Sequence, residues 1–141
     1  MARLARSPRE LLLALRVVLV AISVPLITRL PLAWQEAVLE PRRRPAPDPR
    51  REAWLVANID RLLSAARPVA RPGCLTRGLT HYYFLRRAGV DVQLRYGLGR
   101  PIGEADGHCW LVRDGEPFLE RADPRRSYVE TYSIPRARTR A

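Results

Sequence analysis

PGCLTRGLTHYYFLRRAGV, residues 72–90, is the stretch from which the fold of this chain can be worked out. A Pro-Gly pair precedes Cys74, and apolar side chains then recur at three- and four-residue spacing, which predicts a helix that begins at the cysteine. Arg86 and Arg87 in the last turn, with Gly89 after them, are typical of a helix C-terminus. The thiol at the helix N-terminus can be a buried core group, a disulfide partner, a metal ligand or a nucleophile.

Two further helices are predicted before this one. Ser7, Pro8 and Glu10 are suited to the N-cap, first and third positions of a helix, and the apolar run behind them predicts a helix that bends or ends near Pro25. In residues 52–67, apolar side chains recur every three to four positions along one face. This pattern predicts an amphipathic helix.

Residues 40–51, EPRRRPAPDPRR, are dense in proline and arginine and predict an extended, solvated linker. The linker would separate a short apolar piece from a larger domain. We therefore expect an apolar helical N-terminal segment (1–39), the linker, a main domain (52–134) and a basic tail (135–141).

The second half of the chain alternates apolar and polar side chains, as half-buried strands do. The pair Asp114–Gly115 between two such runs predicts a hairpin turn. Helices followed by strands predict an α+β fold, in which the helix bearing Cys74 packs on a small antiparallel sheet. The expected strands are 92–98, 108–113 and 116–122, with a loop over 100–107, and residues 127–134 are expected to be a last strand or an extended arm.

The chain has 141 residues and a formal net charge of +11, and all 25 basic residues are arginine. A basic surface is compatible with nucleic acid or an anionic membrane. We expect no nucleic-acid binding, because the sequence has no helix-turn-helix, RNA-binding or zinc signature. Two cysteines are fewer than a secreted disulfide framework usually has, and four zinc ligands at suitable spacing are missing. Free thiols in a reducing cytoplasm, without metal or cofactor, are therefore expected.

The N-terminal apolar region needs its own interpretation. Its uncharged run, residues 17–28, contains Pro25 and is flanked by Arg16 and Arg29, whereas a spanning helix needs about 20 apolar residues. No clean small-residue cleavage site follows, as a signal peptide would require. We expect a helix packed on a partner or lying at a membrane surface rather than a cleaved signal or a true span.

Cys74 has a position that favours nucleophilic chemistry over the role of a small buried hydrophobe. The dipole and unpaired N–H groups at a helix N-terminus lower the pKa of a thiol, and Arg77 adds positive charge. A nucleophilic thiol also needs a base. His81 is about two helical turns, roughly 10 Å, from Cys74, so we assign it a structural role. His108, at the start of a strand after a glycine-containing loop, is the better candidate.

Asp114, Glu120 and Asp123 could orient His108, although Asp114 is used by the turn. A two-residue turn pairs His108 with Arg121, which puts Asp123 on the face of His108 and Glu120 on the other face. A one-residue bulge would shift the register and bring Glu120 to His108 instead. The sequence alone does not decide whether Glu120 or Asp123 orients His108.

In this order, the residues resemble the transglutaminase-like cysteine peptidase of lasso-peptide biosynthesis, the peptidase half of the split leader-peptidase pair. That family has Cys-Leu-x-Arg at a helix start, a Leu- and Arg-containing helix end closed by Gly, a strand ending in Gly, then His-x-Trp and an acid after a short hairpin. The resemblance covers residues 52–123 well and the apolar N-terminal region loosely. The matching positions are Cys74, Leu75, Arg77, Leu85, Arg86, Arg87, Gly89, Gly97, His108, Trp110 and Glu120.

The resemblance implies that Cys74 is the nucleophile, His108 the base and Glu120 the orienting acid. The family more often has Asp at the last position, so Asp123 remains an alternative. Cys109 stands where the family usually has a small residue. Because it alternates to the other face from His108, we interpret it as a core residue.

The resemblance further implies a transglutaminase- or papain-like core and a cysteine peptidase that removes the leader from a ribosomally made precursor peptide during lasso-peptide maturation. The implied partners are the precursor peptide, a separate leader-recognition protein and a lasso cyclase, with no cofactor. Two alternatives remain. The same residues can transfer an acyl group on another substrate, or the chain can be a non-catalytic, membrane-associated interaction module.

Overall fold

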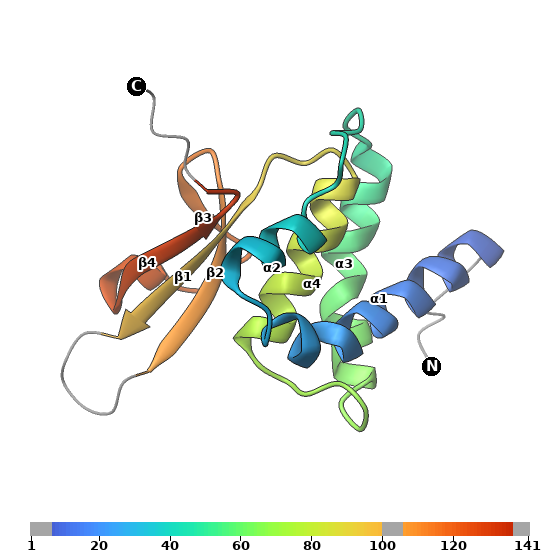
Figure 1. The fold of residues 1–141 in the computed structure, drawn as a ribbon. Helices are drawn as coiled ribbons and strands as arrows, with labels where there is room; N and C mark the ends of the chain where they lie inside the picture. Colours follow the sequence, from blue (N-terminus) through green and yellow to red (C-terminus); the bar gives the residue numbers. More distant parts are fainter. Residues whose placement is uncertain (1–6, 100–105, 137–141) are drawn as a thin grey trace.

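The protein folds as a bundle of helices beside one small sheet (Figure 1), as described by a computed structural model for residues 7–99 and 106–136. All strand pairs are antiparallel, in the order β3-β2-β1-β4. The expected α+β class is confirmed. In chain order the elements are α1 (Pro8–Ile27), α2 (Leu32–Leu39), α3 (Pro49–Ala65), α4 (Cys74–Arg87), β1 (Gln93–Gly99), β2 (Gly107–Arg113), β3 (Glu116–Phe118), a short 3-10 helix (Pro124–Arg126) and β4 (Tyr128–Ile134).

Helix α4 is the central element, because it contacts α1, α2 and α3 on one side and β1 and β2 on the other. Its core side chains, among them Leu79, Tyr82 and Leu85, are fully buried. Gly78 allows α4 to approach the sheet closely, since a Cβ there would lie 2.8 Å from Cys109 Sγ. The opening stretch thus forms the predicted helix, which begins at Cys74 and packs on the sheet.

Helix α1 begins as the sequence predicts, with the Ser7 side chain accepting from the Glu10 backbone N–H at 3.3 Å. It ends at Ile27, with Pro25 inside its last turn. The helix is long and apolar enough to cross a membrane by length and composition alone, which is also true of soluble core helices and signal sequences. Val17 and Val24 belong to the same core cluster as the buried side chains of α3 and α4.

Two segments differ from the sequence-based prediction. Helix α3 begins at Pro49 rather than at residue 52, because the Asp48 side chain caps it by accepting from the Arg51 N–H at 3.1 Å. The returning strand of the Asp114–Gly115 hairpin, expected over 116–122, ends at Phe118. How the chain divides into separately folding parts remains a prediction, and most of the expected 100–107 loop and of the basic tail lies outside the described residues.

The sheet has the register of an unshifted two-residue turn, with Arg113 opposite Glu116. Asp114 and Gly115 both have positive φ, 52° and 81°, as a type I′ hairpin turn requires. On the neighbouring strand, Gly97 is opposite His108 and lies against the indole of Trp110, where a Cβ would be 2.8 Å from the ring. Gly97 therefore makes room for the buried Trp110.

Candidate active site

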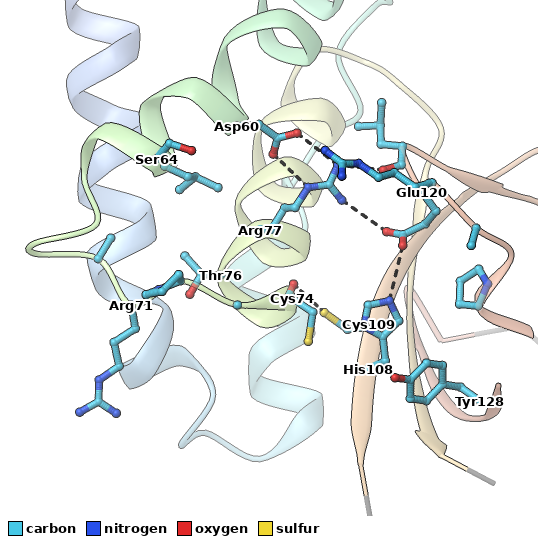
Figure 2. Close-up of a pocket in the computed structure, with 18 of the residues that line it drawn as sticks. Asp60, Ser64, Arg71, Cys74, Thr76, Arg77, His108, Cys109, Glu120 and Tyr128 are labelled. Carbon is cyan, nitrogen blue, oxygen red and sulfur yellow. Dashed lines mark hydrogen bonds and ion pairs between the residues drawn. The ribbon is translucent and has the colours of Figure 1, made fainter.

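A cleft of about 670 Å³ opens where the start of α4 meets the start of β2 and the segment after β3 (Figure 2). Cys74, His108 and Glu120 all line it, although they come from three different elements. The sequence-predicted residues are thus brought together in one place. Asp123 also lines the cleft.

Cys74 is half-buried at the first position of α4, where the N-cap residue Gly73 supplies no side-chain hydrogen bond. The pKa of its thiol is lowered from 9.0 to about 5, chiefly by a hydrogen bond from the Cys109 side chain. The Cys109 backbone N–H and the imidazole of His108 lower it further, against the opposing effect of burial. A thiol with this pKa is a thiolate at neutral pH, which is the nucleophilic form.

His108 lies between the thiol and the acid. Its Nε2 is 3.5 Å from Glu120 Oε2, an ion-pair distance, and its ring also contributes to the ionisation of Cys74. Two aromatic rings hold the imidazole: Tyr128, with ring centroids 4.9 Å apart, and Trp110, stacked at 6.0 Å. His108 therefore has one partner on each side and a fixed ring plane.

Glu120 lies beside His108, although the alternation of side chains along a continued strand would place it on the opposite face of the sheet. The unshifted register predicted Asp123 beside His108, whereas the structure has Glu120 there. The reason is that β3 ends and Leu119 has a positive φ of 61°, which re-aims the residue that follows. Asp123 instead caps the 3-10 helix, and its carboxylate binds the guanidinium and the N–H of Arg125 at 2.8–3.1 Å.

Arg77 connects this turn to the helices, a role that sequence reasoning did not foresee. Its guanidinium donates to the Leu119 carbonyl oxygen at 2.8 Å and to Glu120 Oε1 at 3.3 Å. On its other side it donates to both carboxylate oxygens of Asp60, at 3.0 and 3.2 Å. The only signal in the sequence is the Cys-Leu-x-Arg spacing, which puts Arg77 one helical turn from Cys74 on α4.

Cys109 is buried, as expected, but it is more than a core residue. Its thiol donates to the Cys74 carbonyl oxygen at 3.0 Å and hydrogen-bonds the Cys74 sulfur, which raises the pKa of Cys109 itself. Alternation along β2 turns it away from His108 toward α4, and the start of α4 is where Cys74 lies. Together, these two features of the sequence could have predicted the contact between Cys109 and Cys74.

His81 is fully buried on α4 and does not line the cleft; its Nε2 lies 3.0 Å from Asp60 Oδ1. It therefore supports the carboxylate that holds Arg77. Within residues 7–99 and 106–136, no three His, Cys, Asp or Glu side chains are grouped so that they could hold a metal ion.

Comparison with protein families places most of the chain in a known one. A family model described as the transglutaminase-like superfamily matches residues 11–133, which is most of the chain and includes α1 from Leu11 onward. No curated protein and no solved structure matches.

Proposed function

Because this chain belongs to the transglutaminase-like superfamily, whose members are typically cysteine proteases or acyltransferases, we propose that it is a cysteine peptidase. Catalysis in the superfamily is generally cysteine-dependent. The observation that carries the proposal is that Cys74, at the N-terminus of α4, lines one cleft with a His108 whose Nε2 is 3.5 Å from Glu120 Oε2. The lowered pKa of Cys74, about 5, agrees with this role. Nucleophile, base and orienting acid are then Cys74, His108 and Glu120.

In the proposed reaction, the Cys74 thiolate attacks the carbonyl carbon of the scissile peptide bond. Backbone N–H groups in the first turn of α4 stabilise the oxyanion, since no side chain caps them. His108 delivers the proton taken from the thiol to the leaving amine. It then takes a proton from the water that hydrolyses the thioester, and the thiolate is released. Glu120 holds the imidazole ring during both transfers.

The proposed substrate is a ribosomally made precursor peptide, cut at its leader–core junction during lasso-peptide maturation. This part rests on the resemblance of the ordered motifs around Cys74, His108 and Glu120. It includes a separate leader-recognition protein and a lasso cyclase as partners in the cytoplasm, and no cofactor. A short precursor gene and a cyclase gene beside the coding sequence would support it.

The nucleophile is tested with the Cys74→Ala variant, assayed on the precursor together with the partner proteins. We expect loss of leader removal, because Cys109, the other thiol that lines the cleft, is buried and cannot take over the attack. Normal cleavage by this variant would refute the proposal. Mild alkylation of the wild type should modify Cys74 first, which a non-catalytic interaction module would not show.

The acid is tested by comparing Glu120→Gln with Asp123→Asn. Since Glu120 is the carboxylate beside His108 and Asp123 is bound by Arg125, we expect the Glu120 variant to lose far more activity. General acid–base assistance is worth roughly 100-fold or more, which sets the scale of the loss. Equal losses from both variants would remove Glu120 from the proposed set.

Acyl transfer is the second candidate, because the superfamily includes acyltransferases. The same thioester would then be attacked by an amine rather than by water. Product mass separates the reactions, since hydrolysis adds one water across the bond and transfer joins two chains. A joined product as the main outcome would favour the transferase.

A further inference from the structure

Helix α1 has a second apolar face that the fold leaves uncovered. Ala14, Val17, Ala21 and Val24 are buried against the rest of the protein. On the opposite side, six large aliphatic side chains are 42–65% exposed. At 100° per residue, these six lie within a sector of about 100° along the helix. This α1 outer row consists of Leu11, Leu12, Leu15, Leu19, Ile22 and Leu26.

An exposed apolar row of this size is unusual on a soluble protein and marks a surface that something covers. None of its members lines the Cys74 cleft. An argument about its occupant is therefore independent of the chemistry proposed above.

The charges around the row point to the occupant. Arg9 and Arg16 are exposed on α1 beside the row, and Arg29 is exposed just beyond the end of the helix. The one acid of α1, Glu10, is half-buried and lies on the helical side of Ala14 and Val17, away from the row. The exposed face thus combines aliphatic side chains with cations, which is the composition of helices that lie in a membrane interface.

We propose that the α1 outer row binds the surface of an anionic lipid bilayer, with α1 parallel to the membrane plane. In this arrangement the aliphatic side chains enter the boundary between headgroups and acyl chains, and the flanking arginines contact anionic headgroups. The arrangement needs no rearrangement of the fold, because the other face of α1 stays in the core. A membrane-spanning α1 would have to pull Val17 and Ala21, both fully buried, out of the protein.

A second copy of this chain fits the row less well. Pairing two such faces around a two-fold axis would place arginines of one α1 near those of the other without an acid to compensate them. A partner protein with an acidic, apolar surface would also match the row chemically. If the row binds such a partner rather than lipid, this protein will not bind vesicles that contain only lipid, so vesicle binding distinguishes the two occupants.

The test uses the full chain and two kinds of vesicle, phosphatidylcholine alone and equal parts of phosphatidylcholine and phosphatidylglycerol, with co-sedimentation as the measurement. We expect binding to the anionic vesicles and at least about tenfold weaker binding to the neutral ones. Raising the salt concentration should weaken the anionic binding, because it screens the arginine contribution. These measurements on the wild type need no variant.

The Leu15→Glu, Leu19→Glu double variant should bind at least about tenfold more weakly, since it puts charges in the centre of the row. Its matched control is Val69→Glu, Val129→Glu, at positions 63% and 56% exposed outside α1, which should bind like the wild type. Arg9→Gln, Arg16→Gln should lose mainly the preference for anionic vesicles. Thermal unfolding of each variant checks that the fold is retained.

Three outcomes would overturn the proposal. The first is that anionic vesicles do not sediment the wild type at all, and the second is that the row variant and its control bind equally. The third is a concentration-dependent dimer in sedimentation velocity that the row variant abolishes, with no vesicle binding; this would assign the row to a second copy of the chain.

Discussion

At the scale of single residues, the ionisation of Cys74 depends on a neighbour 35 positions away in the sequence. The Cys109 thiol and backbone N–H both hydrogen-bond the Cys74 sulfur, and together with His108 they lower its pKa to about 5. The Cys109 thiol has a single proton, which it shares between the Cys74 sulfur and the Cys74 carbonyl oxygen 3.0 Å away. A buried second cysteine thus acts on the reactivity of the first.

Replacing Cys109 by Ala should raise the pKa of Cys74 toward its ordinary value of 9.0, because the largest cause of the lowering is removed while the backbone N–H and His108 remain. The measurement is the rate of Cys74 alkylation by iodoacetamide as a function of pH. The wild-type rate should reach half its plateau near pH 5, and the variant at a higher pH. At pH 6 the variant should therefore react more slowly, and above pH 9 the two rates should converge. An unchanged midpoint would contradict the role of Cys109.

At the scale of elements, Arg77 joins three parts of the structure that are far apart in the chain. From α4 it binds Asp60 on α3 and, across 42 residues, the carbonyl of Leu119 in the turn after β3. Asp60 is in turn hydrogen-bonded by the buried His81, and these two partners hold the pKa of Asp60 well below its usual range. The left-handed turn at Leu119 is therefore anchored on a rigid helical support.

The Arg77→Gln variant should lower kcat by about 100-fold with little change in KM, because Glu120 loses the turn that aims it at His108. Arg113→Gln is the matched control, since Arg113 binds Glu52 and lies at the hairpin end of β2, whereas His108 lies at the start of that strand. The control should lose some stability and retain its rate. Equal activity in the two variants would show that Arg77 has only a structural role.

Helix α4 and strand β2 meet at Gly78, and a substitution there tests how closely they pack. Ala is favoured over Gly in a helix by about 1 kcal/mol, but a Cβ at Gly78 would lie 2.8 Å from Cys109 Sγ and 3.2 Å from Leu94 Cδ1. We expect the cost of overpacking to exceed the gain in helix propensity. The Gly78→Ala variant should therefore have a free energy of unfolding lower by about 1–2 kcal/mol, measured by urea denaturation. Adding Cys109→Ala should recover part of the loss. A more stable single variant would show that the interface yields easily.

At the scale of the whole molecule, local sequence signals account for most of the elements. The helix from Cys74 and the Asp114–Gly115 turn follow from spacing and turn chemistry, whereas the sequence leaves the register open between an unshifted turn and a one-residue bulge. The start of α3 was also encoded locally, in the Asp48–Pro49 pair, but the surrounding prolines and arginines favoured a linker. A strong compositional pattern thus concealed a capping signal.

The details of the site were not predictable in the same way. Register arithmetic assumes that β3 continues, whereas it ends at Phe118 and is followed by Leu119, whose conformation is held by a hydrogen bond from Arg77. The contact of Cys109 with Cys74 likewise depends on how α4 is placed against β2. Both are products of tertiary packing, which propensities and periodicity do not contain.

The last connection joins the N-terminal helices to the rest of the protein through a largely buried ion cluster. Arg86, 7% exposed on α4, donates to both carboxylate oxygens of Glu40 at 3.0 and 2.9 Å, directly after α2. It also donates to Asp91 at 2.8 Å, and the Tyr82 hydroxyl donates to Glu40. If residues 1–39 fold as part of one unit with the main domain, this cluster should contribute to the stability of the whole chain.

Glu40→Gln keeps the shape of the side chain but leaves the buried Arg86 without its bidentate counter-charge. We expect the free energy of unfolding to fall by about 3 kcal/mol, since breaking one side of a buried ion pair typically costs 3–5 kcal/mol and Asp91 remains as a partner. Glu130→Gln, which breaks the more exposed pair with Arg95, is the control and should cost less than about 1 kcal/mol. Urea denaturation followed by fluorescence and circular dichroism should give one coincident transition in all three proteins. Equal costs for the two variants, or a separate early transition in Glu40→Gln alone, would mean that the N-terminal helices are only loosely joined to the domain.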